Sequence, residues 1–219
     1  MPYVLCPALG FIPPNSTPEK FTATWEHFTS IPWCRLLLVD DHDFDSPQRA
    51  KVIGFIGQGF NPESPQHDQF IGVTLSSPTA LSHLLSFFQL DNTNYKADSS
   101  TPIVSVSTLF AVGSGVSGYK GILHGGMIMT MLDEGFNAVV EINTLLGKAW
   151  TTQSSAWVTA TMNVKFLKPV PIDGEVCVTA TLDNIEDRRK VKLVARMIGA
   201  NGETMAIAES LWIAKQAKI

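Results

Sequence analysis

The amino-acid sequence predicts an α+β fold in which a curved antiparallel sheet wraps around one long apolar helix. Two observations lead to this prediction: a strongly apolar helical segment at 127–145, and a series of strand-like segments after it, with no alternation of strands and helices. The chain has 219 residues, which is about one and a half times the usual domain length. We therefore expect an N-terminal extension at 1–65 and one domain at 66–219.

The composition favours a folded globular protein. Hydrophobic residues make up 45% of the chain and charged residues 16%, which excludes a disordered chain. No apolar run approaches about 18 residues, and residues 1–20 lack the basic start and apolar run of a signal peptide. We expect no membrane-spanning helix and a cytoplasmic location. The net charge of −4 argues against a nucleic-acid-binding protein.

Cysteine spacing and acidic residues give no support to a metal site. The three cysteines are far apart and form no Cys-x-x-Cys pair, so neither a disulfide framework nor a structural zinc site is expected. The acidic run at 40–43 has no second ligand cluster to accompany it, and we interpret it as a solvated loop. We therefore expect no bound metal.

The first half of the chain is predicted to hold few regular elements. Prolines interrupt residues 1–65, which we expect to be mostly irregular, with one short helix at 21–28. The next segments follow strand and helix patterns bounded by turn residues: a strand at 69–75, a helix at 78–90 with Ser77 as its cap, and a strand at 103–112. A glycine-rich turn then leads to His124.

The segment at 127–145 carries most of the information. Apolar residues surround most of its circumference, which predicts a deeply buried helix. At about 100° per residue, its few polar residues fall in one stripe about a quarter of the circumference wide. These residues are Thr130, Asp133, Glu134, Asn137 and Glu141. The helix is therefore predicted to be central, with one face reserved for polar contacts.

Four segments after Gly147 follow a strand pattern: 156–167, 175–182, 189–198 and 203–214. The turns between them predict an antiparallel meander with one apolar face, which the long helix would cover. In the first of these strands, strict alternation places Ala156, Val158 and Ala160 on the apolar face. Alternation places Thr159 on the other face, and a bulge or twist would be needed to turn it toward the helix.

The start of the helix carries the motif with chemical meaning, Gly121-Ile122-Leu123-His124-Gly125-Gly126. Two glycines let a ligand approach the backbone, and their N–H groups lie at the positive end of the helix dipole, where an oxyanion would be stabilised. Asp133 follows His124 by nine residues, about two and a half helical turns. Asp133 is too remote from this helix start to serve the same reacting carbon directly, and a second chain could supply it.

These residues resemble the hotdog-fold acyl-CoA thioesterases, in the His-Gly-Gly branch of the phenylacetate-degradation type. The match rests on Gly121, His124, Gly125, Gly126 and Asp133, and on the later segment 159–171 with its Lys-Pro turn. The resemblance is strong over 103–214. It implies a hotdog fold and hydrolysis of an acyl-CoA thioester to a free acid and a thiol. It implies no cofactor, with coenzyme A entering only as part of the substrate.

The resemblance also implies roles for individual residues. Asp133 would activate water or attack the thioester itself, and Thr159 would orient the water. The backbone N–H of Gly125 or Gly126, from the other subunit of a homodimer, would polarise the carbonyl group. His124 would either fix the glycine turn or transfer protons. The sheets of the two subunits would join edge to edge, and the sequence leaves open whether dimers pair into tetramers.

The last third of the chain is basic, with 10 Lys and Arg against 7 Asp and Glu over 147–219. Three of these residues, Arg188, Arg189 and Lys190, follow one another at a predicted turn. They would either be solvated or meet the phosphates of coenzyme A.

Other interpretations have weaker support in the sequence. Gly113-x-Gly115-x-x-Gly118 matches a dinucleotide-binding pattern, but no βαβ unit surrounds it. Two rival functions remain compatible with the fold: a non-catalytic acyl-CoA-binding module, and a hydratase or dehydratase that acts on a thioester. The sequence also leaves open whether the acyl carrier is coenzyme A or a carrier protein.

Overall fold

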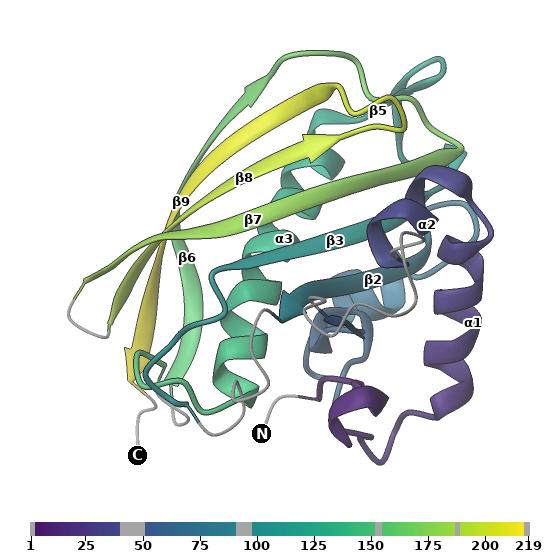
Figure 1. Cartoon of the computed structure of the whole chain (residues 1–219). Coiled ribbons are helices and arrows are strands. Elements are labelled where there is room, and N and C mark those ends of the chain that lie inside the picture. Colours follow the sequence, from purple (N-terminus) through teal and green to yellow (C-terminus); the bar gives the residue numbers. More distant parts are fainter. Residues whose placement is uncertain (1–2, 40–50, 91–97, 152–154, 187–188, 217–219) are drawn as a thin grey trace.

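The computed structural model describes residues 3–39, 51–90, 98–151, 155–186 and 189–216 (Figure 1). A seven-stranded antiparallel sheet curves around the helix α3 (Gly125–Leu145), which confirms the predicted fold class. In spatial order, the strands are β1 (Lys51–Phe55), β2 (Leu81–Leu90), β3 (Ser105–Val112), β7 (Gly174–Glu186), β8 (Lys190–Ile198), β9 (Thr204–Gln216) and β6 (Ser155–Phe166).

The central helix forms where the sequence predicts it. Of its 21 residues, 12 are buried, among them Met131, Leu132 and Phe136. They pack against the inner face of the sheet in the main hydrophobic core. Near its end, Asn143 bonds both the N–H and the C=O of Ile103, at 2.8 and 2.9 Å, which ties the helix to the start of β3. The orientation of α3 is thereby fixed by its apolar faces and by this side-chain pair.

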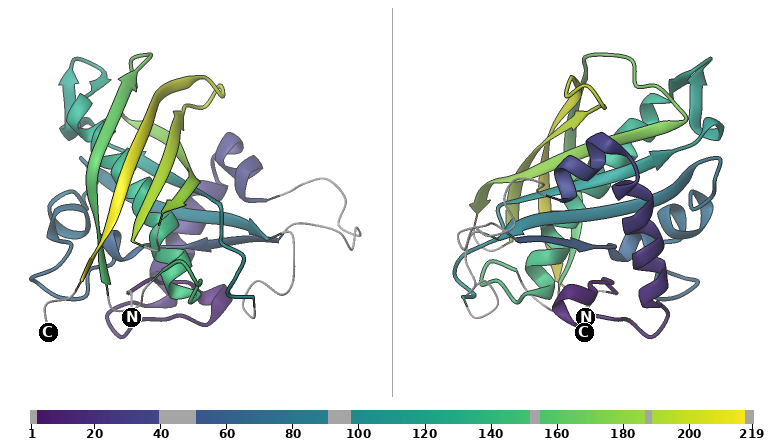
Figure 2. Two further views of the ribbon diagram at one scale, coloured as in Figure 1. Left: turned by 90° about the vertical axis from the view of Figure 1, so that its left-hand side faces the viewer. Right: turned by 45° about the vertical axis from the view of Figure 1, so that its right-hand side comes forward.

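The N-terminal segment contains the expected short helix and one helix more. The helix α1 (Pro18–Thr29) covers the predicted range, and α2 (Pro32–Leu38) follows it directly. Both lie on the face of the sheet opposite α3 (Figure 2). There Phe28 and Leu38 form a second core with outward residues of β2, β3 and β7. The strand β1 also comes from this segment and extends the sheet, and the domain boundary at residue 65 stays a prediction.

Two predictions for the region before residue 103 were wrong. Residues 78–90 were expected to form a helix, but Leu81–Leu90 is the strand β2. Both faces of β2 are covered, one by the main core and the other by α1 and α2, so its apolar residues do not alternate and resemble a buried helix. Residues 69–75 were expected to be a strand, but Phe70–Thr74 is a short π-helix, η3.

The four strands after residue 147 are confirmed, with a correction within β6. The pairing of β6 with β9 shifts between Thr159 and Thr161, which marks a bulge at Ala160. Before the bulge, Trp157 packs on the core, and Thr159, although exposed, contacts α3 through Asp133. Ala156, Val158 and Ala160 are exposed. The predicted alternation therefore holds only after the bulge, where Met162 and Val164 pack on the core.

The segment that leads into α3 is a small hairpin. It consists of the short turn η4 (Ser114–Val116) and the strands β4 (Ser117–Tyr119) and β5 (Ile122–Leu123). The N–H of Leu123 donates to the C=O of Val170 at 2.8 Å, so the hairpin is held against the loop after β6. None of the described helices combines the length and apolarity that a bilayer crossing requires.

Candidate active site

His124 caps the start of α3 with its own side chain. Its Nδ1 accepts a hydrogen bond from the N–H of Gly126 at 2.9 Å, so this nitrogen is unprotonated and Nε2 carries the hydrogen. The backbone C=O of His124 accepts from Met127 and Ile128 at 2.9 and 3.1 Å. The imidazole is thus hydrogen-bonded to the glycine turn, and a role of His124 in proton transfer stays a prediction.

These contacts distinguish the two glycines of the motif. The N–H of Gly126 is occupied by His124, whereas the N–H of Gly125 makes no hydrogen bond within the described part of the chain. A Cβ atom added at Gly125 would lie 3.7 Å from the ring of Phe166, which is ordinary contact. The N–H of Gly125 is therefore the donor that is available at the positive end of the helix dipole.

Asp133 and Thr159 are in direct contact. The Thr159 hydroxyl donates to Asp133 Oδ1 at 2.7 Å, from β6 to the middle of α3. This contact depends on the bulge at Ala160, since regular alternation through that position would turn Thr159 to the outer face. Burial raises the pKa of the half-buried Asp133 carboxyl, and the hydrogen bond from Thr159 lowers it. Because burial is the larger effect, the pKa lies above its usual value.

The two halves of the candidate site are separated within one protomer. Asp133 lies eight residues after Gly125 on the same helix, a rise of about 12 Å. The structure therefore brings Asp133 to Thr159 and His124 to Gly126, but it does not bring the two pairs together. A reacting carbonyl group could not contact Asp133 and the N–H of Gly125 of the same protomer at once.

The polar stripe of α3 divides between two surroundings. Asp133 faces β6, but Glu141 accepts hydrogen bonds from the backbone N–H of Gln58 and from Asn137. Gln58 belongs to the short turn η2 (Gln58–Phe60) in the N-terminal segment. Sequence reasoning missed this partner, because a backbone N–H carries no signal in the residue pattern. The only available sign was the pair of glycines at 57 and 59.

Two tryptophans next to Thr159 were also missed. Trp157 lies two residues before Thr159 on the same face, and Trp212 of β9 is the pairing partner of Thr159. Their indole N–H groups are buried and have no hydrogen-bond partner within the described residues. Trp212 is only 4% exposed. Thr159 therefore has two aromatic neighbours on the inner face of the sheet, each with a buried N–H group that has no partner among the described residues.

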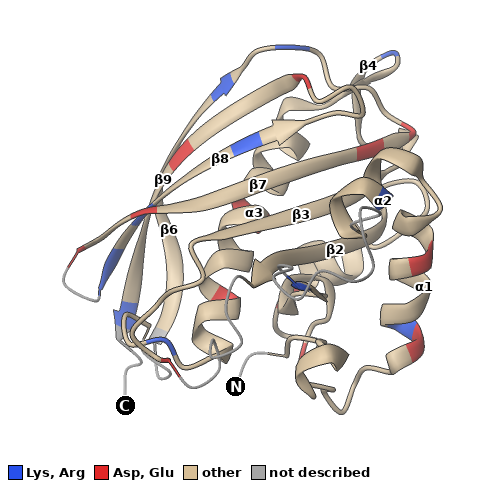
Figure 3. Ribbon diagram, in the orientation of Figure 1, with Lys and Arg blue, Asp and Glu red and all other residues tan. Residues whose placement is uncertain are grey.

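The basic residues named from the sequence are only partly described. Arg188 lies outside the described residues, whereas Arg189 and Lys190 are exposed where β8 begins. Figure 3 shows Lys and Arg on β6, β8 and β9. Lys190 is paired with Ile213 of β9, which is paired with Val158 of β6, so this turn lies two strands from the strand that carries Thr159. Contact with coenzyme A phosphates stays a prediction.

Gly118, in the hairpin before α3, packs closely on the cap residue. A Cβ atom there would lie 3.1 Å from the Cα of His124, so the glycine allows this close packing. Among the described residues, no group of three or more His, Cys, Asp or Glu side chains has the arrangement of a metal site.

A comparison with protein families matches residues 120–194 to the thioesterase superfamily. This match covers about a third of the chain, so it is a similarity of that segment. The match begins just before the His-Gly-Gly motif and includes α3, β6 and β7, with most of β8. Both residues of the Asp133–Thr159 pair, and Gly125, lie within the matched residues.

The individual proteins that the chain resembles are distant in sequence. The chain is 27% identical over 165 residues to Verlamelin biosynthesis protein B of a Lecanicillium species, covering 64% of this chain and 69% of that protein. It is 32% identical over 81 residues to Acyl-coenzyme A thioesterase THEM4 of Bos taurus, covering 37% of this chain and 29% of that protein. The chain thus spans under a third of the length of that relative.

One similar solved structure is a hypothetical thioesterase with coenzyme A from Streptococcus pneumoniae. It has a TM-score of 0.43 and 14% sequence identity, and the match covers 54% of this chain and 86% of that chain.

Proposed function

We propose that this protein hydrolyses acyl-CoA thioesters, with Asp133 as the general base. The observation that carries the proposal is the contact between Asp133 and Thr159, a half-buried carboxyl group with a hydroxyl beside it. The family match supports thioester hydrolysis, and the name of the THEM4 relative supports coenzyme A as the carrier.

The reaction needs three protein groups. Asp133 accepts a proton from a water molecule, whose oxygen forms a bond with the thioester carbon. The hydroxyl of Thr159, which donates to Asp133, can accept a hydrogen bond from that water. The N–H of Gly125 donates to the carbonyl oxygen as negative charge develops on it. The carbon–sulfur bond then breaks, and the proton held by Asp133 passes to the leaving thiolate, which yields a free acid and coenzyme A.

The separation of Asp133 from Gly125 leads us to place the site between two copies of the chain. The strand β6 is at the end of the sheet order, and its exposed edge region includes Val158 and Phe166. Two β6 strands paired antiparallel around a two-fold axis at Asn163 would set Met162 opposite Val164, two residues that both face the core. Because the bulge adds one residue at Ala160, this pairing would set Thr159 opposite Phe166. Phe166 packs beside Gly125 in its own protomer. Asp133 of one copy would then meet Gly125 of the other.

A thiol-release assay tests the proposal. We expect the chain to convert at least one of a set of short, medium, long and aromatic acyl-CoA esters to equal amounts of acid and free coenzyme A. Asp133→Asn should lower kcat by about 10²–10⁴-fold, since it keeps the shape of the side chain and removes the base. Glu209→Gln on the outer face of β9 is the matched control.

Two results would count against this function. One is undiminished turnover by Asp133→Asn on every ester that the wild-type chain hydrolyses. The other is tight binding of acyl-CoA without release of thiol, which would indicate a binding module. Product analysis with hydroxyacyl and enoyl esters separates hydrolysis from hydration or dehydration.

A further inference from the structure

Two acidic side chains of α3 pack against a short backbone segment, Gly57-Gln58-Gly59, which we call the 57–59 segment. The N–H of Gln58 donates to both carboxyl oxygens of Glu141 at 3.2 Å. A Cβ atom at Gly57 would lie 2.6 Å from Oε2 of Glu141. A Cβ atom at Gly59 would overlap the carboxyl group of Glu134. Each glycine therefore makes room for one carboxyl group.

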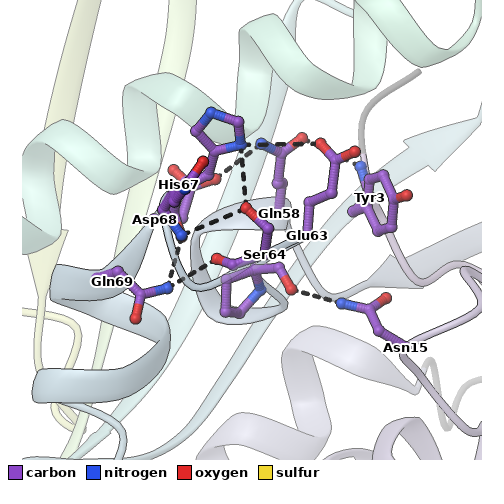
Figure 4. A network of polar contacts seen from close by, with 10 residues as sticks. Tyr3, Asn15, Gln58, Glu63, Ser64, His67, Asp68 and Gln69 are labelled. Atoms are coloured by element: carbon purple, nitrogen blue, oxygen red, sulfur yellow. Dashed lines mark hydrogen bonds and ion pairs between the residues drawn. The ribbon is translucent and has the colours of Figure 1, made fainter.

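Glu134 and Glu141 have polar neighbours, and none of the described neighbours that act on them is a cation. Asn137 donates to Glu141 Oε1 at 3.0 Å, and the side chain of Gln58 donates to Asp68 Oδ2 at 2.7 Å. Figure 4 shows Gln58 and Asp68 within the polar contacts of their loop. Within the described residues, no Lys or Arg pairs with either acid, and the titratable groups that act on them are other carboxyl groups.

This environment favours the uncharged form of both acids. Burial raises the pKa of Glu141 to about 7, although the hydrogen bonds from Gln58 and Asn137 act in the opposite direction. Burial is also the main cause that raises the pKa of Glu134 well above its usual value. The nearby carboxyl groups of Glu141, Asp68 and Asp133 raise it further. The uncharged form of Glu134 is therefore favoured.

Glu134 matters because it is next to Asp133 in the chain. If both were charged, each would raise the pKa of the other, and the second charge would also oppose negative charge on the substrate oxygen. Glu134 as a whole is half-buried, and its carboxyl group is the part that packs against Gly59. Contact with the 57–59 segment thus determines whether this carboxyl group meets water.

We propose that the 57–59 segment is a positioning element for the thioesterase site: its backbone packs on the carboxyl groups of Glu134 and Glu141 and shields that of Glu134 from water, so that no second charge forms beside Asp133. This inference rests on the proposed role of Asp133 as the base. It gives the N-terminal segment a part in turnover, although that segment lies outside the residues that match the superfamily. Glu134 acts here through Asp133 and has no contact with the substrate.

The variant Gly59→Ala tests this proposal through the pH dependence of kcat/KM. The added methyl group should push the Glu134 carboxyl into water, where it ionises beside Asp133. We expect the acidic limb of the profile to move up by about one pH unit. Adding Glu134→Gln to Gly59→Ala should return the limb to its wild-type position, because the new charge is removed. Gly174→Ala is the matched control, since an added Cβ there meets nothing within 4 Å.

Two outcomes would overturn the proposal: no shift in Gly59→Ala, or a shift that persists when Glu134 is also replaced, since that would reflect distortion of α3. A second measurement uses the wild-type chain, so it does not depend on a folded variant or on enzymatic activity. A ¹³C NMR titration of the carboxyl groups of the wild-type chain should show Glu134 titrating well above the usual range of a glutamate carboxyl. A Glu134 that titrates within the usual range would also overturn the proposal. A chain that hydrolyses no thioester would reject the proposed function and leave this titration unaffected.

Discussion

At the scale of single residues, the pKa of Asp133 is set by burial against one hydrogen bond. Thr159→Val removes the hydrogen bond that lowers this pKa, so the pKa should rise further. Because the base must be ionised, the acidic limb of kcat/KM should move to higher pH. Thr159→Ser keeps the hydroxyl and should leave the limb near its wild-type position. A pH–rate profile of the three proteins checks this, and a limb that moves to lower pH in Thr159→Val would contradict it.

The N–H of Gly125 can be removed with little change in structure. Gly125 is the first residue of α3, where proline is well tolerated, and His124 before it has an extended backbone, with φ of −64° and ψ of 136°. We expect Gly125→Pro to lower kcat by about 10²–10³-fold because an oxyanion donor is lost. Gly125→Ala keeps the N–H and should retain most of the activity. Steady-state kinetics with thermal melting separates the lost donor from a lost fold, and equal kinetics for the two variants would argue against this donor.

The same residues show how far the sequence could predict the site. The positions of Asp133 and Gly125 follow from a helix and a glycine pair, which are local patterns. The choice between Gly125 and Gly126 depends on where the His124 imidazole lies, and this is a matter of three-dimensional geometry. The face of Thr159 depends on one bulge residue, Ala160, which no local pattern marks.

At the scale of elements, the errors and successes have a common cause. A regular spacing of apolar residues in the sequence marks α3, β7, β8 and β9. Each of these elements has one side on the core or a regular turn at its ends. The strand β2 is buried on both faces, and its run of Leu and Phe carries no period. Its covering helices come from the segment that we expected to be mostly irregular.

The contact between α3 and the N-terminal segment predicts a pH-dependent stability. In the folded state, the pKa of Glu141 is raised to about 7 from a usual value of 4.5. The stability that this group contributes is therefore fully present below about pH 4 and is lost as the pH rises through about 7. Glu141→Gln stays uncharged at every pH and can still accept from Gln58. We expect the free energy of unfolding of the wild-type chain to fall more than that of Glu141→Gln between pH 5 and 8.

Urea unfolding at several pH values measures this difference, and Glu209→Gln on the exposed face of β9 is the control. Parallel curves for the wild-type chain and Glu141→Gln would show that Glu141 is ionised at the same pH in the folded and unfolded states. A steeper fall for the variant would contradict the direction of the pKa shift.

At the scale of the whole molecule, the two halves of the candidate site lie apart, because Asp133 and Gly125 of one protomer are eight residues apart along α3. The exposed edge of β6 ends the sheet order, and Thr159 and Phe166 mark the levels of the two half-sites along it. A two-fold pairing of this edge would place a base from one chain beside a donor from the other, twice in each dimer. A dimer made from two different inactive chains is therefore a sensitive test.

Chains with Asp133→Asn and chains with Gly125→Pro should each form inactive homodimers. A mixed dimer, purified through two different affinity tags, contains one site with both replacements and one site with neither. We expect this mixed dimer to recover about half of the turnover of the wild-type dimer, because one of its two sites is intact. If both groups acted within one protomer, each chain would carry its own defect, and mixing would restore nothing. Light scattering on the same samples determines whether the active species is the dimer.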